Sequence, residues 1–297
     1  MLFRSLAFGG LTMKYEIPET TRAAAALMAQ AQGKAFVLAG GTDLLVRMKS
    51  GLLEPDLLVD IKRVAAMNGI ENTAKGFRIG AAVPGVEVGA HKALGRAWPG
   101  VVEAAELIGS DQIQGRCTIV GNLCNASPAA DTVPALIAAG ARAIVVSESG
   151  RRTVPVEKIP TGPGTTSLAK GEIIEAIMLP GRGPRSADAY LRFIPRTEMD
   201  IAVVGAGICI TLSKGVVAKA KVVLGAVAPT VVVVPDAAKA IIGTKLDAAA
   251  LEKLAEACSA ACNPIDDKRG TVAYRTHVAG VLAKRAAKIA YKRAGGK

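Results

Sequence analysis

A short strand that ends in two glycines and leads into a helix is the feature that most restricts the fold of this chain. Residues 34–38 form an apolar run typical of a buried strand, and Ala39-Gly40-Gly41 interrupts it. Apolar residues then recur at helical spacing over 44–48, which predicts that a helix begins near Thr42 or Asp43. We therefore expect a strand, a glycine turn and a helix N-terminus in immediate succession.

Such a succession is suited to holding an anion. The first N–H groups of a helix have no partner within the helix, and they favour negative charge. Glycines allow the main chain to come within hydrogen-bonding distance of a phosphate, because no Cβ stands in the way. The same residues also serve for plain chain reversal. The stretch by itself leaves both interpretations open.

A second glycine-containing stretch lies further along the chain. Residues 117–123 are again apolar and contain Gly121-Asn122, and Ser127-Pro128 follows. Proline is tolerated at the first helical position, so we expect Pro128 to open a helix with Ser127 as its cap. Residues 131–141 are then apolar and alanine-rich, as in a buried helix. The polar residues of this segment are Thr118, Asn122, Ser127 and Asp131.

Together the two stretches suggest a grip on a single diphosphate from two sides. The alternative is a pair of unrelated loops, and the local pattern leaves this choice open as well.

Composition excludes several classes of protein. Of 297 residues, 51% are hydrophobic and only 3% aromatic, which predicts aliphatic cores. No uninterrupted apolar run approaches the roughly 20 residues of a membrane span. The formal net charge is +12, but the basic residues are dispersed and aromatic residues for base stacking are scarce, which argues against nucleic-acid binding.

The cysteines and histidines do not suggest a metal site or a catalytic residue. Five cysteines form no CxxC pair, and only His91 and His277 could assist them as ligands. Neither histidine stands beside an obvious nucleophile, so an acid–base triad has no support. Free thiols in a reducing cytoplasm are the expected state of the cysteines, which are Cys117, Cys124, Cys209, Cys258 and Cys262.

The order of predicted elements indicates an α+β protein. Helix, strand, helix and strand alternate up to residue 65, where two strands are expected to pair in parallel, and a larger mixed unit follows. Three predicted antiparallel strands over 187–225 then precede three helices. We expect an N-terminal extension (1–12), a first domain (13–180, with subdomains 13–65 and 66–180), a linker (181–186) and a C-terminal domain (187–297).

Four motifs, in this order, carry a resemblance to a known family. They are Ala39-Gly40-Gly41-Thr42-Asp43-Leu44-Leu45, Thr118-Ile119-Val120-Gly121-Asn122, Ser127-Pro128-Ala129-Ala130-Asp131, and Arg196-x3-Asp200-Ile201-Ala202. From Met13 onwards the chain resembles the FAD-binding medium subunit of the molybdenum hydroxylases, which include carbon monoxide dehydrogenase and xanthine dehydrogenase. It departs from the family at Val120, where relatives usually have a glycine. A valine there requires that position to avoid left-handed backbone.

The resemblance implies a fold, a cofactor and a set of contacts. The fold is a two-part FAD-binding domain of the PCMH type, followed by a C-terminal domain of a three-stranded antiparallel sheet with helices. FAD is the implied cofactor of this chain. Arg192 would lie near the isoalloxazine ring, where a cation stabilises reduced flavin. The implied FAD-binding residues are Leu38, Ala39, Gly40, Gly41, Thr42, Asp43, Leu44, Leu45, Ile108, Thr118, Gly121, Asn122, Ser127, Asp131, Ile174 and Arg192.

The resemblance also implies partners. A large subunit would hold the molybdenum cofactor and a small subunit the [2Fe–2S] clusters, in a cytoplasmic dimer of heterotrimers. Electrons would reach FAD here and pass to NAD⁺, a quinone, O₂ or another acceptor. One alternative is a self-contained FAD oxidoreductase with its own substrate, although no proton donor for it is evident. Another is a phosphate-binding module without redox work.

Overall fold

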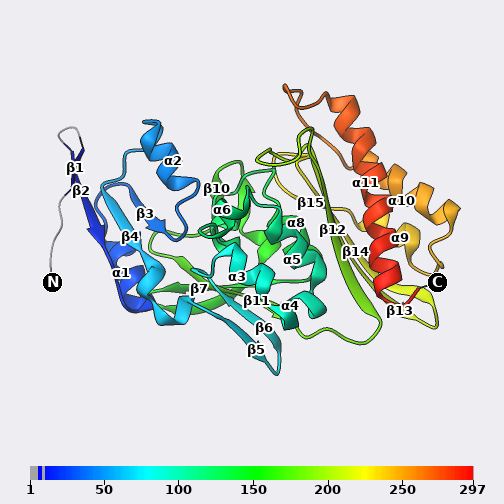
Figure 1. Ribbon diagram of the computed structural model, residues 1–297, viewed down its shortest axis with the longest axis horizontal. Coiled ribbons are helices and arrows are strands. Elements are labelled where there is room, and N and C mark those ends of the chain that lie inside the picture. Colours follow the sequence, from blue (N-terminus) through cyan, green and yellow to red (C-terminus); the bar gives the residue numbers. More distant parts are fainter. Residues whose placement is uncertain (1–5, 9–10, 297) are drawn as a thin grey trace.

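The computed structural model describes residues 6–8 and 11–296, and its three larger sheets follow one another along its longest axis (Figure 1). The expected extension 1–12 lies partly outside the described residues, at 1–5 and 9–10. The rest of it contributes to two strands of the first sheet. Helices cover the second and third sheets, which gives the mixed α+β architecture predicted from the sequence.

The first sheet is small and contains the first glycine turn. Its strand order is β1-β2-β4-β3, and both β2 and β3 pair in parallel with β4, which confirms the predicted parallel pairing. Helix α1 is capped by Thr20, whose Oγ1 accepts from the N–H of Ala23 at 3.1 Å. The elements are β1 (Leu6–Phe8), β2 (Leu11–Glu16), α1 (Thr21–Gln30), β3 (Ala35–Leu38), α2 (Leu44–Lys49) and β4 (Leu57–Asp60).

Two short 3-10 turns, η1 (Ile61–Arg63) and η2 (Ala65–Met67), connect the first sheet to the second. The second sheet is antiparallel throughout, in the order β5-β6-β11-β7-β8. Its strands are β5 (Ile70–Thr73), β6 (Gly76–Gly80), β7 (Arg142–Ser147), β8 (Gly150–Pro155) and β11 (Ile173–Pro180). Between β8 and β11 lie η3 (Val156–Lys158) and the short antiparallel pair β9 (Pro160–Gly162) and β10 (Thr165–Thr166).

Six helices lie between β6 and β7. One of them contains the second glycine stretch, which was expected to form a turn. Thr118 caps a helix by accepting from the N–H of Gly121 at 2.8 Å, so Gly121 lies inside a helix rather than in a turn. Val120 is also helical and needs no left-handed backbone. Ser127 and Pro128 open no helix. The six are α3 (Gly85–Ala90), α4 (Lys92–Ala97), α5 (Pro99–Glu106), α6 (Asp111–Gln114), α7 (Ile119–Cys124) and α8 (Thr132–Ala138).

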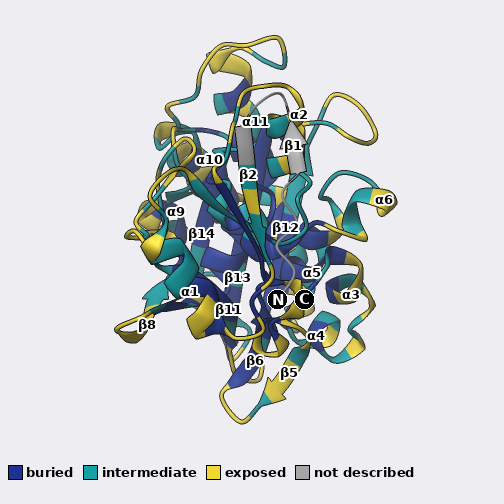
Figure 2. Ribbon diagram, turned by 90° about the vertical axis from the view of Figure 1, so that its left-hand side faces the viewer, coloured by how far each residue is buried: buried dark blue, intermediate teal, exposed yellow. Residues whose placement is uncertain are grey.

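The C-terminal unit is the predicted antiparallel sheet with helices, to which the structure adds a fourth strand of two residues. Helix α11 crosses the sheet, and its fully buried alanines let the helix approach the strands closely. Strand β13 is largely buried, and so is the second half of β14 (Figure 2). The elements are β12 (Ser186–Phe193), β13 (Val204–Ser213), β14 (Val216–Gly225), β15 (Val232–Val233), α9 (Pro235–Ile241), α10 (Ala248–Ala260) and α11 (Val272–Arg293).

The described residues form two hydrophobic cores, one for the first two sheets and one for the C-terminal unit. One core runs through the first two sheets and their helices, and the other lies between the C-terminal sheet and its helices. Of the segment predicted as a linker, residues 181–185 lie between the end of β11 and the start of β12, and Ser186 is already the first residue of β12. Among the described residues, no helix is long and apolar enough to cross a membrane.

Candidate functional site

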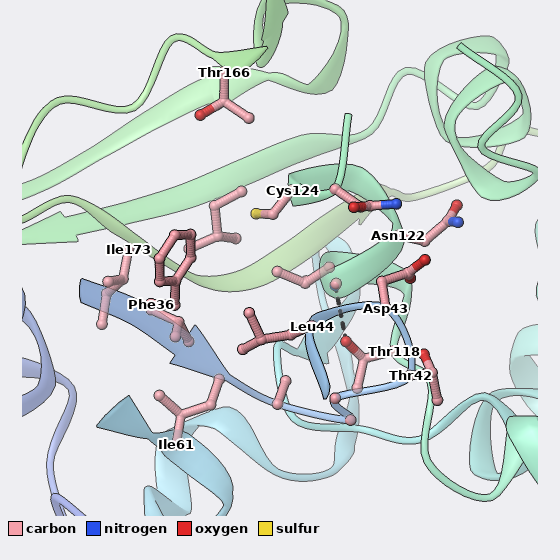
Figure 3. Close-up of a pocket in the computed structure, with 18 of the residues that line it drawn as sticks. Phe36, Thr42, Asp43, Leu44, Ile61, Thr118, Asn122, Cys124, Thr166 and Ile173 are labelled. Atoms are coloured by element: carbon pink, nitrogen blue, oxygen red, sulfur yellow. Dashed lines mark hydrogen bonds between the residues drawn. The ribbon is translucent and has the colours of Figure 1, made fainter. Parts of the chain in front are cut away.

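A cavity of about 340 Å³ lies between the first sheet and the second. Its walls come from the first glycine turn, the connector η1–η2, the N-terminal turn of α7, strand β11 and the 164–168 loop. In Figure 3, Thr42, Asp43, Thr118 and Asn122 gather on one side of the view, and Phe36, Ile61 and Ile173 on the other. The cavity therefore has a polar part and an apolar part.

The structure brings most of the residues predicted from the sequence to this cavity. Eleven of the sixteen line it, and they come from segments far apart in the chain. These are Ala39, Gly40, Gly41, Thr42, Asp43, Leu44, Ile108, Thr118, Gly121, Asn122 and Ile174. The remaining five do not line it, and they are Leu38, Leu45, Ser127, Asp131 and Arg192.

Gly40 explains how the two glycine-containing stretches come together. A Cβ on Gly40 would lie 1.9 Å from the carbonyl oxygen of Arg116, which is closer than any real contact. The first turn therefore packs directly on the main chain that leads into Thr118. Gly41 has a φ of +76°, a left-handed conformation that glycine adopts without strain. Each glycine has its own steric reason for being there.

The first turn leaves main-chain donors free. In the part of the chain that the structure describes, the N–H groups of Thr42, Asp43 and Leu44 donate to no protein acceptor, and the main-chain bonds of this segment start with the N–H of Leu45, which donates to the carbonyl oxygen of Gly41 at 3.0 Å. All three residues line the cavity, together with the cationic side chain of Arg47. Burial raises the pKa of Asp43, while Arg47 opposes that shift. These donors and Arg47 suit an anionic ligand.

A lysine side chain holds a carbonyl group of the same turn. The Nζ of Lys62 donates to the carbonyl oxygen of Ala39 at 3.2 Å and to Oδ2 of Asp60 at 2.8 Å. Asp60 is buried and also accepts from the Tyr15 hydroxyl. Because the Ala39 carbonyl is held by Lys62, the turn has a defined peptide orientation.

The second stretch contributes polar side chains that are themselves positioned by hydrogen bonds. Oδ1 of Asn122 accepts from Oγ1 of Thr132 at 2.7 Å and from its N–H at 3.2 Å, which ties α7 to the start of α8. The hydroxyl of Thr118 is occupied by the N–H of Gly121. The polar part of the cavity is thus held in place before any ligand binds.

Sequence reasoning missed most of the apolar wall. Phe36 and Val37 on β3, Ile61 and Met67 in the connector, and Ile173 on β11 all line the cavity. Their hydrophobicity was evident from the sequence, but the sequence pattern of a buried strand residue is the same whether its side chain faces a core or a cavity. Only the pairing of the strands shows which side each residue faces.

Asp131 and Arg192 form a buried cluster outside the cavity lining. Nη1 of Arg192 lies 3.0 Å from Oδ2 of Asp131 and donates to the carbonyl oxygen of Leu107 at 2.7 Å. The Tyr190 hydroxyl donates to Oδ1 of Asp131 at 3.1 Å. Burial raises the pKa of Asp131 to about 6, against the opposing effects of Arg192 and Tyr190. The cluster holds the segment that leads to Ile108, a residue of the cavity wall.

The cysteines near the cavity are not poised for chemistry. Cys117 and Cys124 both line it, and burial raises their thiol pKa values to about 11 and 12. They are therefore protonated near neutral pH, and a thiol is a far weaker nucleophile than a thiolate. Among the described residues, no three His, Cys, Asp or Glu side chains come together in a way that could hold a metal.

The donors and walls of the cavity fit a flavin dinucleotide. A diphosphate requires free N–H groups, which Thr42, Asp43 and Leu44 present. The ribityl and ribose hydroxyls require polar partners such as Asn122, and flat rings require aliphatic walls such as Ile173. Gly40 and Gly41 shape this cradle through the packing of the turn itself, because a Cβ on either residue would meet protein atoms, at 1.9 Å for Gly40 and 2.9 Å for Gly41.

Comparison with known proteins gives matches over nearly the whole chain. Residues 11–182 match the family model described as "FAD binding domain in molybdopterin dehydrogenase". Residues 189–290 match the model described as "CO dehydrogenase flavoprotein C-terminal domain".

Individual relatives agree with these matches. The carbon monoxide dehydrogenase medium chain of Hydrogenophaga pseudoflava is 30% identical over 280 residues, covering 94% of this chain and 97% of the relative. A putative xanthine dehydrogenase FAD-binding subunit of Escherichia coli is 29% identical over 266 residues, covering 89% and 91%. The solved carbon monoxide dehydrogenase of H. pseudoflava superimposes with a TM-score of 0.91 at 31% identity, covering 95% of this chain and 98% of that chain.

Proposed function

The chain belongs to the family of FAD-binding medium subunits of the molybdenum hydroxylases, and we propose that it is the electron-transfer subunit of such an enzyme. It has an FAD-binding domain, and its relatives are subunits of dehydrogenases. The observation that carries the proposal is the convergence of two distant stretches, 39–44 and 118–122, on one cavity with a polar and an apolar part.

In this proposal the cavity residues divide the work of holding FAD. The free N–H groups of Thr42, Asp43 and Leu44 bind the diphosphate, with Arg47 adding positive charge. Thr118 and Asn122 provide the polar surroundings of the sugar hydroxyls. The aliphatic residues Ile61, Ile108, Ile173 and Ile174 pack on the rings and exclude water.

The bound flavin supplies the redox chemistry, since it accepts electrons singly or in pairs. The protein supplies position and electrostatics. Asp131 and Arg192 do so indirectly, because they anchor the Leu107 carbonyl next to Ile108. We assign no catalytic residue to this chain, because substrate oxidation belongs to a partner subunit in this proposal.

The partners follow from the same family membership. A large subunit binds the molybdenum cofactor and oxidises the substrate, and a small subunit carries the [2Fe–2S] clusters that deliver electrons to FAD here. NAD⁺, a quinone, O₂ or another acceptor then takes them. We propose a dimer of heterotrimers in the cytoplasm. The relatives' description as medium chains and FAD-binding subunits supports the part of this proposal that places the chain beside other subunits.

Two measurements test the proposal. The purified chain should show a flavin absorbance spectrum, and the released cofactor should be FAD rather than FMN. Tagged chain expressed with its neighbouring genes should then retain a large and a small subunit through purification. A chain that binds no flavin after reconstitution, or that oxidises a substrate by itself, would contradict the proposal.

A further inference from the structure

Glu175 is a buried carboxylate that the proposed FAD site does not use directly. Its side chain is 2% exposed. It accepts from Oγ1 of Thr21 at 2.7 Å and from guanidinium nitrogens of Arg151 at 2.6 Å and Arg78 at 3.1 Å. A buried carboxylate is costly without such partners, so this geometry is strongly preferred over one that separates them.

The partners of Glu175 belong to separate parts of the molecule. Thr21 is the first residue of α1 and so belongs to the first unit. Arg78 is on β6 and also donates to the carbonyl oxygen of Ala66 at 2.6 Å, which holds the connector between the units. Arg151 is on β8, at the far edge of the second sheet. One carboxylate thus joins the first unit, the connector and the second sheet.

We call the contacts of Glu175 with Thr21, Arg78 and Arg151 the Glu175 joint. This joint is next in sequence to residues of the cavity walls. Glu175 follows Ile173 and Ile174 on β11, and Met67 follows Ala66 in the connector, and all three apolar residues line the cavity. The pairing of β11 with β7 shifts register between Ile174 and Ala176, which leaves Glu175 without a partner in that ladder. Such irregularities change the direction of side chains next to functional sites.

A close packing contact reinforces the joint. A Cβ on Gly171, just before β11, would lie 2.7 Å from Cβ of Ala29 on α1. Helix α1 therefore touches the second unit both through Thr21 at its start and through Ala29 near its end. Helix α1 thus packs next to β11, which forms one wall of the cavity. The first sheet, to which α1 belongs, carries the glycine turn that forms the opposite wall.

The geometry points to Glu175 as a positioning residue that sets the spacing between the two walls of the cavity, and so the affinity for FAD. The inference rests on the proposed function for its ligand, but the joint itself is a property of the FAD-free chain. The hydrogen bond from Thr21 links Glu175 to the first unit, and Arg78 links it to the connector through the carbonyl oxygen of Ala66.

The experiment uses the full chain freed of FAD, with the variants Glu175→Gln, Thr21→Val and Thr21→Ser. Glu157→Gln is the control, because Glu157 forms an ion pair with Lys221 away from the cavity, with the two side chains 34% and 33% exposed. Two quantities are measured at a temperature at which circular dichroism shows each variant folded. One is the dissociation constant for FAD, and the other is the hydrogen-exchange rate of backbone amides over 61–69 and 173–176.

We expect Glu175→Gln to weaken FAD binding about tenfold, the factor that corresponds to losing a hydrogen bond to a charged group. Thr21→Val should have a smaller effect in the same direction. Thr21→Ser, which keeps the hydroxyl, should restore wild-type affinity, and Glu157→Gln should leave it unchanged. Exchange over 61–69 and 173–176 should accelerate in Glu175→Gln and Thr21→Val before any FAD is added.

The inference is overturned if Thr21→Val binds FAD with wild-type affinity and shows unchanged exchange, even where Glu175→Gln lowers the melting temperature. That pattern would mean that Glu175 stabilises the fold without setting the cavity. Should Glu175→Gln fail to fold, Thr21→Val against Thr21→Ser decides the question alone. If the wild-type chain binds no FAD, the proposed function fails, and the exchange rates of the FAD-free variants still test the joint.

Discussion

Replacing Gly40 by alanine should separate the two stretches that meet at the cavity. The added Cβ would lie 1.9 Å from the Arg116 carbonyl oxygen and 2.6 Å from the carbonyl carbon, both of them main-chain atoms. Ordinary contact begins at 3.4 Å, so the first distance would have to grow by about 1.5 Å. Neither side can yield by rotating a flexible side chain, so the turn itself must move.

The cost of that movement should appear mainly in FAD binding. Overpacking of this kind costs about 1–3 kcal/mol. The FAD-free protein can relieve the overlap by letting the turn open, whereas FAD binding requires the original spacing. A cost of about 2 kcal/mol, transferred to binding, corresponds to a roughly thirtyfold higher dissociation constant at about 1.4 kcal/mol per factor of ten.

The assay is titration of the FAD-free chain with FAD, followed by the change in flavin fluorescence. Gly95→Ala is the matched control, because it adds the same methyl group to helix α4 with no neighbouring atom within 4 Å. It should bind FAD as the wild type does and melt at the same or a higher temperature, since alanine favours helix. Wild-type affinity in Gly40→Ala would refute the reasoning, because the contact with Arg116 would then not shape the site.

Three further predictions concern other parts of the site. Thr118→Val removes the acceptor for the Gly121 N–H and should destabilise the chain by about 1 kcal/mol, with weaker FAD binding; an unchanged melting curve would contradict the capping role. Asp131→Ala removes the acceptor that Arg192 and the Tyr190 hydroxyl share and leaves both buried donors unpaired, so it should lower the free energy of unfolding by about 3 kcal/mol. Loss of FAD affinity without loss of stability would instead make Asp131 a ligand contact. Burial raises the pKa of Glu175, but its hydrogen bonds and Arg151 outweigh burial and hold that pKa below the usual 4.5. The stabilisation should therefore be complete above about pH 4.5 and be lost as pH falls through the lowered value, so urea titrations of wild type and Glu175→Gln should converge in acid.

The amino-acid sequence determined the elements whose signals are local. The apolar run before Gly40 predicted strand β3, and the break at Gly41 with helical spacing beyond it predicted α2. The three antiparallel strands expected over 187–225 and the three helices expected after them are likewise present, because alternation and helical periodicity are properties of neighbouring residues. The family motifs added that the two glycine stretches belong to one site, which periodicity alone left open.

Local reasoning failed where two local structures were both compatible with the residues. The stretch around Gly121 was expected to be a second glycine turn, yet it is a helix capped by Thr118. A glycine and a short apolar run fit either form, and the buried neighbours of α7 decide between them. Ser127-Pro128 has a helix-opening pattern that the structure does not use, since α8 starts only at Thr132.

Tertiary structure alone decided which side chains meet. Asp131 has a polar motif's sequence context but turns to Arg192, 61 residues away, instead of lining the cavity. In the sequence, Glu175 is a single charged residue in an apolar strand. Its proposed positioning role depends on a hydrogen bond from Thr21, which is 154 residues away. Local patterns record whether a residue is buried and not what it is buried against. The partners of a buried charge, and the wall that an isoleucine such as Ile173 completes, are therefore fixed only when the sheets pack together.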